Sequence, residues 1–437
     1  MEKKNEFYYG VATASYQIEG GVEEREKNIW DTFSHQKGNI LNDDNGDTAC
    51  DSYHRSDEDL SLLKELGVNA YRFSISWSRL LKDGISIVDE RGVKYYRNIL
   101  LKLKENHITP FVTLFHWDLP QCLQDQGGFL SPLFPSWFAS YTKAVLDNFG
   151  DLIENYITFN EPENTIYRGL VIGKFAPGEK RSPQEALFAL HQILKAHGKA
   201  YSLIKEYNRE NKVGFAICGW VPVIKKEKDY EKAKEFYFQV PSEIGEGNSI
   251  YLYPILFGDY PKEYYERFKG LYPDITEEDK KLIHTGLDFI GANYYSGYYF
   301  EEGKAFDPID RRRMDNGWYV INECVYYGLK FLSEKFSLPI MITENGTCDD
   351  TEEAEGRVRD ENRIQNLKEV FFYMKKAKEE GVDLRGYFHW SLLDNFEWAE
   401  GYTSRFGLTY IDFLHGQKRI KKDSFFEYQK LIKEKKI

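Results

Sequence analysis

The segment NYITFNEP, residues 155–162, shows the pattern from which the fold of this chain can be predicted. Residues 155–160 form an apolar run of strand length, and polar residues follow where the run ends. The same order recurs in seven further runs, at 8–16, 68–77, 108–117, 212–220, 288–296, 338–345 and 384–394. Because the runs are apolar on both faces, they are typical of parallel strands that helices cover.

Segments with a helical pattern lie between these runs. Residues 56–67 begin with Ser56 as the expected N-cap, continue with an acidic first turn and end at Gly67. Further helices are expected over 92–106, 136–150, 182–207 and 361–381. Eight strands, each followed by at least one helix, predict an α/β fold, namely a (β/α)8 TIM barrel with elaborated βα-loops. An open doubly wound sheet is the alternative, and the number of strands favours closure.

The length of the chain is compatible with a single barrel. A chain of 437 residues would on average contain two or three domains, but a (β/α)8 barrel with long loops can exceed ~400 residues. The sequence has no linker and no shift in composition, so residues 1–437 are predicted to form one barrel domain.

The composition excludes several classes of protein. Hydrophobic residues make up 42% and aromatic residues 16%, which excludes disordered and collagen-like chains. The net charge of −12 argues against a nucleic-acid partner. No run of ~18 apolar residues could span a membrane, and residues 1–10, MEKKNEFYYG, lack the apolar centre of a signal peptide. A cytoplasmic location is therefore expected.

Cysteine and histidine spacing gives no support for a metal or redox site. The five cysteines include no C-x-x-C pair, and His191 and His197 fall on different faces of the helix expected over 182–207. The glycine-rich phosphate motifs and the serine-hydrolase motif G-x-S-x-G are missing as well. No metal and no cofactor is predicted.

Two glutamates stand where strands end. Glu161 follows the fourth strand and Glu344 lies at the end of the seventh, so in a closed barrel both should face one mouth. Two carboxyls that flank a bond suit glycoside hydrolysis, with retention at a separation of about 5–5.5 Å and inversion at about 6.5–9.5 Å. Each glutamate alone could instead be a structural ion-pair partner. Arg72, a charge inside an apolar run, needs an acidic partner, and Glu344 is the expected one.

The residues around these glutamates are those that a sugar site needs. A sugar presents hydroxyl groups at its edge and apolar C–H groups on its faces, so it is bound by amides, acids and histidine together with aromatic rings. Side chains of these kinds fall at strand ends or in the loops after them: Gln17, His116, Trp117, Asn160, Asn293, Trp318, Trp390, Glu397 and Trp398.

At this point the chain resembles glycoside hydrolase family 1, the β-glucosidase family. The resemblance covers nearly the whole chain and rests on segments in the same order: FYYGVATASYQIEG (7–20), NIWDTF (28–33), ACDSYHRSDEDLSLLKELGVNAYRFSISWSRL (49–80), TLFHWDLP (113–120), TFNEP (158–162), ANYY (292–295), ITENG (342–346), WSLLDNFEWAEGY (390–402) and RFGL (405–408).

The resemblance implies a role for each matching residue. Glu344 would be the nucleophile and Glu161 the general acid/base. Asn160 would bind the sugar 2-hydroxyl, and Arg72 with Tyr295 would hold Glu344 ionised. The resemblance further implies a set of substrate-binding residues, Gln17, His116, Trp117, Asn293, Trp318, Trp390, Glu397, Trp398 and Phe406.

Glu397 bears on the sugar that is accepted. A carboxylate there can accept hydrogen bonds from the 4- and 6-hydroxyls and would repel a 6-phosphate, and the segment lacks the Lys that phospho-glycosidases carry. Unphosphorylated glucosides, galactosides or fucosides are therefore favoured. Glu161 likewise argues against the thioglucosidase branch, which has Gln there.

The chain departs from its relatives on the leaving-group side. Position 163 is Glu, which either favours a polar or cationic leaving group or, as we expect, pairs with Arg168. Residues 319–330, YVINECVYYGLK, replace a segment that relatives usually carry, which leaves the leaving-group preference open.

The sequence thus predicts a β-glucosidase-type enzyme. It would be a retaining exo-β-glycosidase acting on non-reducing-end β-D-glucosyl residues, with galactosyl and fucosyl residues as further candidates. A 6-phospho-β-glycosidase and a non-catalytic sugar-binding barrel are the alternatives, and the second would be expected to lack Glu161 or Glu344. The expected partner is a small β-glycoside or oligosaccharide, without nucleic acid or membrane; a homo-oligomer is left open.

Overall fold

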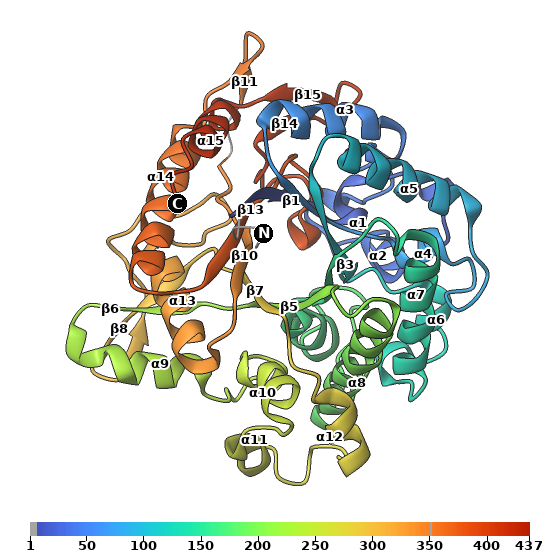
Figure 1. Cartoon of the computed structure of the whole chain (residues 1–437), viewed down its shortest axis with the longest axis vertical. Helices are drawn as coiled ribbons and strands as arrows, with labels where there is room; N and C mark the ends of the chain where they lie inside the picture. Colours follow the sequence, from blue (N-terminus) through green and yellow to red (C-terminus); the bar gives the residue numbers. More distant parts are fainter. Residues whose placement is uncertain (1–6, 350–351) are drawn as a thin grey trace.

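Eight parallel strands form a closed barrel in the described part of the chain, residues 7–349 and 352–437 of a computed structural model (Figure 1). In spatial order they are β1 (Tyr8–Ala12), β2 (Ala70–Ser74), β3 (Thr109–Phe115), β4 (Asn155–Asn160), β5 (Lys212–Cys218), β7 (Phe289–Asn293), β10 (Ile340–Asn345) and β13 (Leu384–Trp390). Strand β1 closes the barrel on β13, in parallel register from Tyr8 opposite Gly386 to Ala12 opposite Trp390. The predicted (β/α)8 barrel is confirmed, and the open sheet is wrong.

Helices surround the barrel, as Figure 1 shows. The main ones are α3 (Ser52–Leu66), α5 (Glu90–Glu105), α7 (Phe134–Phe149), α8 (Pro183–Tyr207), α13 (Glu323–Phe336), α14 (Glu361–Glu379) and α15 (Asp423–Lys433). Shorter helices are α1 (Ser15–Ile18), α2 (Ile29–Ser34), α4 (Trp77–Leu80), α6 (Gln121–Gln124), the π-helix η4 (Asn164–Val171), α9 (Tyr230–Phe238), α10 (Ser249–Phe257), α11 (Lys262–Arg267) and α12 (Glu277–Ile283). The connections also hold small sheets of β6 (Val221–Ile224), β8 (Gly297–Glu301) and β9 (Lys304–Phe306), of β11 (Glu353–Ala354) and β12 (Arg357–Val358), and of β14 (Thr409–Asp412) and β15 (Lys418–Lys421).

One helix begins earlier than its sequence pattern predicts. Helix α3 starts at Ser52 and is kinked at Arg55, whose φ of −117° and ψ of 22° are not helical. Ser56 follows this kink inside the element, and the N-cap position belongs to Asp51, whose φ of 56° is left-handed. The extra turn is held by tertiary contact, because the Arg79 guanidinium lies 4.0 Å over the ring of Tyr53. Gly67 ends the helix with φ of 79°, as predicted.

Aromatic rings fill the inside of the barrel. The Phe111 ring lies 4.9 Å from that of Phe388 and 6.1 Å from that of Phe289. Glycines make room for these rings: a Cβ on Gly10 would lie 2.5 Å from the ring of Phe388, and one on Gly214 would lie 2.2 Å from that of Phe289. Large and small residues therefore alternate, and the interior is a packed core.

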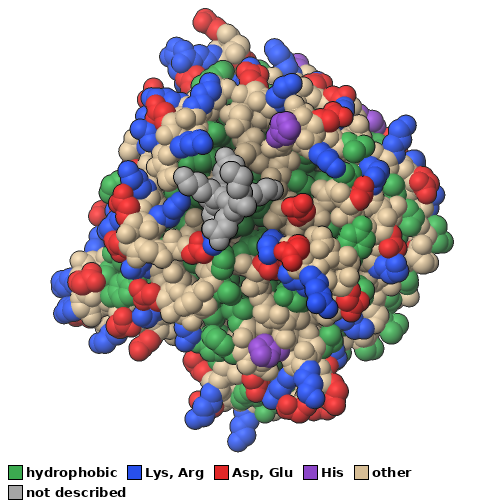
Figure 2. Space-filling view, viewed as in Figure 1, with side chains coloured by type: hydrophobic (Ala, Val, Ile, Leu, Met, Phe, Trp, Pro, Cys, Tyr) green, Lys and Arg blue, Asp and Glu red, His purple; other side chains and the backbone are tan. Residues whose placement is uncertain are grey.

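The outer surface carries charges of both signs. On the face shown in Figure 2, acidic and basic side chains are interspersed. Within the described residues, no helix combines the length and the apolar character that crossing a bilayer requires. The first six residues of the segment judged to lack a signal peptide lie outside the described residues. The cytoplasmic location stays a prediction.

Candidate active site

A cavity of about 660 Å³ opens where the carboxyl ends of the barrel strands meet. Its inner wall is formed by side chains from the ends of β3, β4, β7, β10 and β13 and from the loop that follows β13. All of the predicted site residues except Gln17 and Arg72 line this cavity. Gln17 and Arg72 are buried, and each donates a hydrogen bond to a carboxyl that lines it.

Glu161 stands at the point where β4 turns into η4. Its φ of 43° is left-handed, and its N–H donates to the carbonyl of Ala216 at 2.9 Å, which holds the turn. The side chain is 7% exposed, and two amides donate to it: Asn293 to Oε1 at 2.7 Å and Asn164 to Oε2 at 2.6 Å. Burial, and then the charge of Glu344, raises the pKa of Glu161 to about 8.

Glu344 lies at the end of β10 and is 4% exposed. Arg72 donates to its Oε1 at 2.6 Å, the ion pair expected from the sequence, and the Tyr295 hydroxyl donates to its Oε2 at 2.7 Å. Burial raises the pKa of Glu344, while Arg72 and Tyr295 act in the opposite direction. Because a cation and a hydroxyl donate directly to Glu344, whereas only neutral amides donate to Glu161, Glu344 loses its proton first.

Two amides connect these carboxyls. Asn160 accepts from Arg72 at 2.6 Å and from Asn293 at 3.0 Å through its Oδ1. The Asn293 Nδ2 also donates to Glu161, and its Oδ1 accepts from the Thr343 hydroxyl at 2.6 Å. The two glutamates therefore belong to one hydrogen-bond network at a single place in the cavity.

A third carboxyl, that of Glu397, lines the same cavity. Gln17 donates to Glu397 at 3.2 Å, and burial, followed by the charge of Glu344, raises the pKa of Glu397 to about 8. His116 accepts from Asn160 at 3.2 Å when its Nε2 is unprotonated. Burial, and then Arg72, lowers the pKa of His116 well below its ordinary value, so the ring is neutral. Near neutral pH the His116 ring and the Glu397 carboxyl are both largely uncharged, and they offer donors and acceptors to a polyol.

Aromatic rings complete the wall. Trp390 stacks on His116 with ring centroids 5.8 Å apart, and Trp117 packs on Trp398 at 4.5 Å. Trp318 and Phe406 each pack edge to face on Tyr295, both at 5.7 Å. The cavity therefore combines apolar faces with polar edges.

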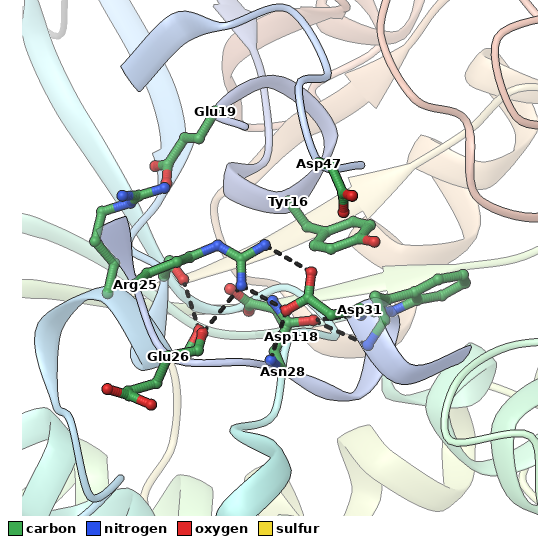
Figure 3. A network of polar contacts seen from close by, with 12 residues as sticks. Tyr16, Glu19, Arg25, Glu26, Asn28, Asp31, Asp47 and Asp118 are labelled. Carbon is green, nitrogen blue, oxygen red and sulfur yellow. Dashed lines mark hydrogen bonds and ion pairs between the residues drawn. The ribbon is translucent and has the colours of Figure 1, made fainter. Parts of the chain in front are cut away.

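A buried network beside α1 supports this wall (Figure 3). Arg25 donates to both oxygens of Asp31, at 2.5 and 2.8 Å, and Asp31 in turn accepts from the Asn28 N–H at 2.8 Å. The Arg25 guanidinium lies 5.7 Å over the ring of Tyr16, which stacks on Trp398 at 6.2 Å. The network thus fixes the short helix from which Gln17 reaches Glu397.

One expected contact does not form. Glu163 makes no ion pair with Arg168, so that expectation is wrong. Glu163 is instead 1% exposed, and its Oε2 has no partner among the described residues. Burial raises the pKa of its carboxyl well above the ordinary value, which favours the neutral acid.

Sequence reasoning missed several residues of the site. Asn164, which donates to Glu161, follows it by three positions, a spacing that places both on one side of a helical turn and could have indicated the contact. Arg168 and Glu246 also line the cavity. Glu246 lies in residues 239–248, a connection with no periodic pattern that would mark it. In the described chain, no three His, Cys, Asp or Glu side chains are grouped so that they could hold a metal ion.

Comparison with protein families gives one match across the chain. The profile of glycosyl hydrolase family 1 matches residues 2–437.

Comparison with known proteins gives similar matches at the level of whole chains. The β-glucosidase A of Thermotoga maritima is 42% identical over 443 residues, which cover 98% of this chain and 97% of that protein. The 1,4-beta-D-glucan glucohydrolase of Thermotoga neapolitana is 40% identical with the same coverage. Among solved structures, the Thermotoga maritima β-glucosidase in complex with deoxynojirimycin has a TM-score of 0.90 at 40% identity, covering 98% of this chain and 97% of that one. Its complex with cyclophellitol has the same TM-score, identity and coverage.

Proposed function

Because the chain belongs to glycosyl hydrolase family 1 and is a β-glucosidase-type glycoside hydrolase, we propose that it removes β-D-glucosyl residues from the non-reducing end of its substrates with retention of configuration. Glu344 is the nucleophile and Glu161 the general acid/base. The observation that carries this proposal is the unequal environment of the two carboxyls, since Glu161, with a pKa of about 8, stays protonated beside an ionised Glu344. One cavity thus offers both an acid and a nucleophile at neutral pH.

In the first step the glycosidic bond breaks. A carboxylate oxygen of Glu344 forms a bond to the anomeric carbon, while the Glu161 proton passes to the glycosidic oxygen and the leaving group departs as an alcohol. Arg72 and Tyr295 favour the ionised form of Glu344 before attack. Asn160 binds the 2-hydroxyl, a contact that strengthens in the oxocarbenium-like transition state.

In the second step water releases the sugar. Once Glu344 is esterified its negative charge is gone, so the pKa of Glu161 falls and the carboxyl, now ionised, accepts a proton from water. The oxygen of that water bonds to the anomeric carbon and the ester bond to Glu344 breaks. Two inversions at one carbon give net retention.

The inner wall of the cavity suits an unphosphorylated glycosyl residue. Glu397 accepts hydrogen bonds from the 4- and 6-hydroxyls with Gln17 behind it, and His116 and Asn293 face the same sugar, which rests on Trp390. Above its pKa of about 8 the Glu397 carboxylate repels a 6-phosphate, and below that pH the ionised Glu344 in the same cavity does so. Glucosides are the principal substrates, with galactosides and fucosides as further candidates that a set of nitrophenyl glycosides differing only in the sugar would rank.

Azide trapping tests the two roles together. In Glu344→Gly, azide takes the place of the missing nucleophile and displaces the leaving group of a dinitrophenyl β-glucoside once, so α-glucosyl azide forms. In Glu161→Ala, azide attacks the ester on Glu344 instead, so β-glucosyl azide forms. Without azide we expect kcat/KM on an unactivated glucoside to fall about 10³-fold or more in each variant. The assignment is wrong if the two variants give the same anomer or if Glu344→Gly keeps wild-type activity.

A further inference from the structure

The outer part of the cavity contains an arginine and a glutamate that the proposed mechanism does not use. Arg168 comes from η4 and Glu246 from residues 239–248, between α9 and α10, and both line the cavity. In the described chain neither charged group makes a hydrogen bond or an ion pair; the Arg168 guanidinium only lies 5.2 Å over the ring of Phe175. The five N–H donors of Arg168 and the carboxylate of Glu246 are thus unpaired, and both groups line the same cavity.

The charge of Arg168 influences Glu246, but the two groups do not form an ion pair. Burial raises the pKa of the Glu246 carboxyl, and the Arg168 charge is the chief influence that lowers it. An ion pair would bring nitrogen and oxygen within 4.0 Å, and none is present between them. Both charged groups are therefore available to a ligand in the cavity that they line.

The backbone holds Glu246 in this place. The preceding Gly245 has a left-handed φ of 89° and packs so closely on η4 that a Cβ would lie 2.4 Å from the Ile166 side chain. The Tyr251 hydroxyl donates to the Gly245 carbonyl at 2.8 Å. Glu246 is therefore fixed against the helix that carries Arg168.

The other side of Glu246 is also anchored. In the amide orientation that satisfies its neighbours, Asn248 donates to the Cys218 carbonyl at 2.7 Å and to Glu163 at 3.1 Å and accepts from the Tyr237 hydroxyl at 3.0 Å. Residues 239–248 are thus tied to the end of β5 and to the turn that carries Glu161. These hydrogen bonds fix the segment as part of the cavity wall.

Aromatic rings lie in the same outer region. Trp220 is 37% exposed, stacks on Tyr298 at 6.0 Å and meets Trp318 edge to face at 5.9 Å, and all three rings line the cavity. Ring faces receive the C–H groups of a pyranose, while charged groups bind its hydroxyls.

We propose that Arg168 and Glu246 form a polar clamp that selects leaving groups which are themselves sugars, so that the natural substrates are β-linked di- or oligosaccharides; this rests on the proposed function. An anionic leaving group would be attracted by Arg168 but repelled by Glu246. A cationic leaving group would be attracted by Glu246 but repelled by Arg168. A neutral sugar satisfies both, because one hydroxyl accepts from Arg168 while a neighbouring hydroxyl donates to Glu246. An alkyl leaving group satisfies neither.

The test compares leaving groups on a fixed glucosyl unit. Arg168→Met and Glu246→Gln remove one charge each, and kcat/KM is measured on cellobiose, cellotriose, octyl β-glucoside and 4-nitrophenyl β-glucoside. We expect a ten- to hundredfold loss on the two oligosaccharides, as for a lost hydrogen bond to a charged group, and a change within about twofold on the others. Lys180→Met and Glu235→Gln remove the same charges at exposed positions outside the cavity and serve as matched controls.

The outcomes separate the two proposals. Equal losses on all four substrates, or no loss on the oligosaccharides, overturn the clamp and leave the proposed function standing. A wild-type protein that hydrolyses none of the glucosides overturns the proposed function and the clamp with it. Unchanged activity of both variants on 4-nitrophenyl β-glucoside shows that they are folded, so a selective loss on oligosaccharides supports the clamp.

Discussion

Two glutamates, two positions apart at the end of β4, have different surroundings. Glu161 faces the cavity and accepts hydrogen bonds from Asn164 and Asn293. Glu163 points away from it into a buried region where Asn248 is its only side-chain donor in the described chain. Burial raises the pKa of both carboxyls, but both oxygens of Glu161 accept from side-chain amides, whereas one oxygen of Glu163 has no partner in the described chain. That difference suits Glu161 alone for a cycle of proton loss and gain.

Removing one of these donors should shift the pH dependence of catalysis. Asn164 stabilises ionised Glu161, so in Asn164→Ala the pKa of Glu161 rises. Because Glu161 must be protonated to act as an acid, activity is lost as pH rises through that pKa, near 8 in the wild type. We expect the alkaline limb of kcat/KM to move up by about one pH unit, measured with a phenyl glucoside. The same change at Asn148, on α7, is the control; a limb that stays in place or moves down would contradict this role.

Glu163 should affect stability through its protonation. A carboxyl whose pKa is raised on folding contributes stability that is complete below its unfolded pKa, near 4.5, and that declines as pH rises. Glu163→Gln mimics the neutral acid and has no proton to lose. Between pH 4.5 and pH 8 we therefore expect the free energy of unfolding of the variant to rise relative to that of the wild type by about 1 kcal/mol or more. Urea unfolding at both pH values measures this difference. A difference that does not vary with pH would show that Glu163 is ionised in the folded state.

Helix α8 shows how an element's sequence and its packing impose separate demands. Ser182 and Glu185 form a reciprocal cap at its start, in which the Ser182 side chain accepts from the Glu185 N–H and the Glu185 carboxylate accepts from the Ser182 N–H. Gly198, in contrast, stands in the helix interior, where glycine is unfavourable. It is accommodated because α12 crosses there: a Cβ would lie only 2.1 Å from the Leu282 carbonyl oxygen.

This contact predicts a substitution that goes against helix propensity. The higher helix propensity of alanine in Gly198→Ala would raise the free energy of unfolding by up to about 1 kcal/mol. The clash with a backbone atom, however, forces α8 and α12 apart and lowers it by about 1–3 kcal/mol. We expect a net loss of stability in chemical unfolding. Ser202→Ala, an exposed site one turn further on, should be neutral or slightly stabilising. A more stable Gly198→Ala protein would mean that the two helices separate freely.

At the scale of the molecule, the two ends of the described chain meet. The Tyr428 hydroxyl on α15 donates to the Gly10 carbonyl on β1 at 2.7 Å. Nearby, Lys422 and Asp394 form a fully buried ion pair at 2.7 Å, and Asp394 also pairs with Arg405 at 2.9 Å, one residue before Phe406 of the cavity wall. We propose that residues 1–437 form one domain, because the C-terminal helix and the first strand share these contacts.

Removing an aromatic ring from the centre of the barrel tests whether the chain unfolds as one domain. Phe111→Ala empties space between Phe388 and Phe289, and we expect a loss of about 3–5 kcal/mol in a denaturant transition that remains single. Phe372→Ala, at a ring that is 61% exposed on α14, is the matched control and should change little. Two separated transitions, in which part of the chain keeps wild-type stability, would refute the single domain.

The barrel and the two glutamates at its mouth could be predicted from the amino-acid sequence, because both follow from local order along the chain. Apolar runs of strand length at regular intervals specify the strands, and the residue after each run falls at the carboxyl rim whatever the rest of the fold does. The partner of Arg72 could also be inferred, since a buried charge has to be paired. Each of these conclusions needs only the neighbours in sequence and a general rule of solvation.

Contacts between side chains of distant segments, in contrast, could be identified only in the folded chain. Nothing near Glu163 in the sequence shows that its partner is Asn248 rather than Arg168, and nothing in residues 239–248 predicts that Glu246 faces the cavity. The early start of α3 depends in the same way on Arg79, which lies beyond the helix. Such contacts depend on close packing between elements that are far apart in the chain, where shifts of an ångström or two decide whether charges pair. Periodic patterns in the sequence do not indicate such contacts.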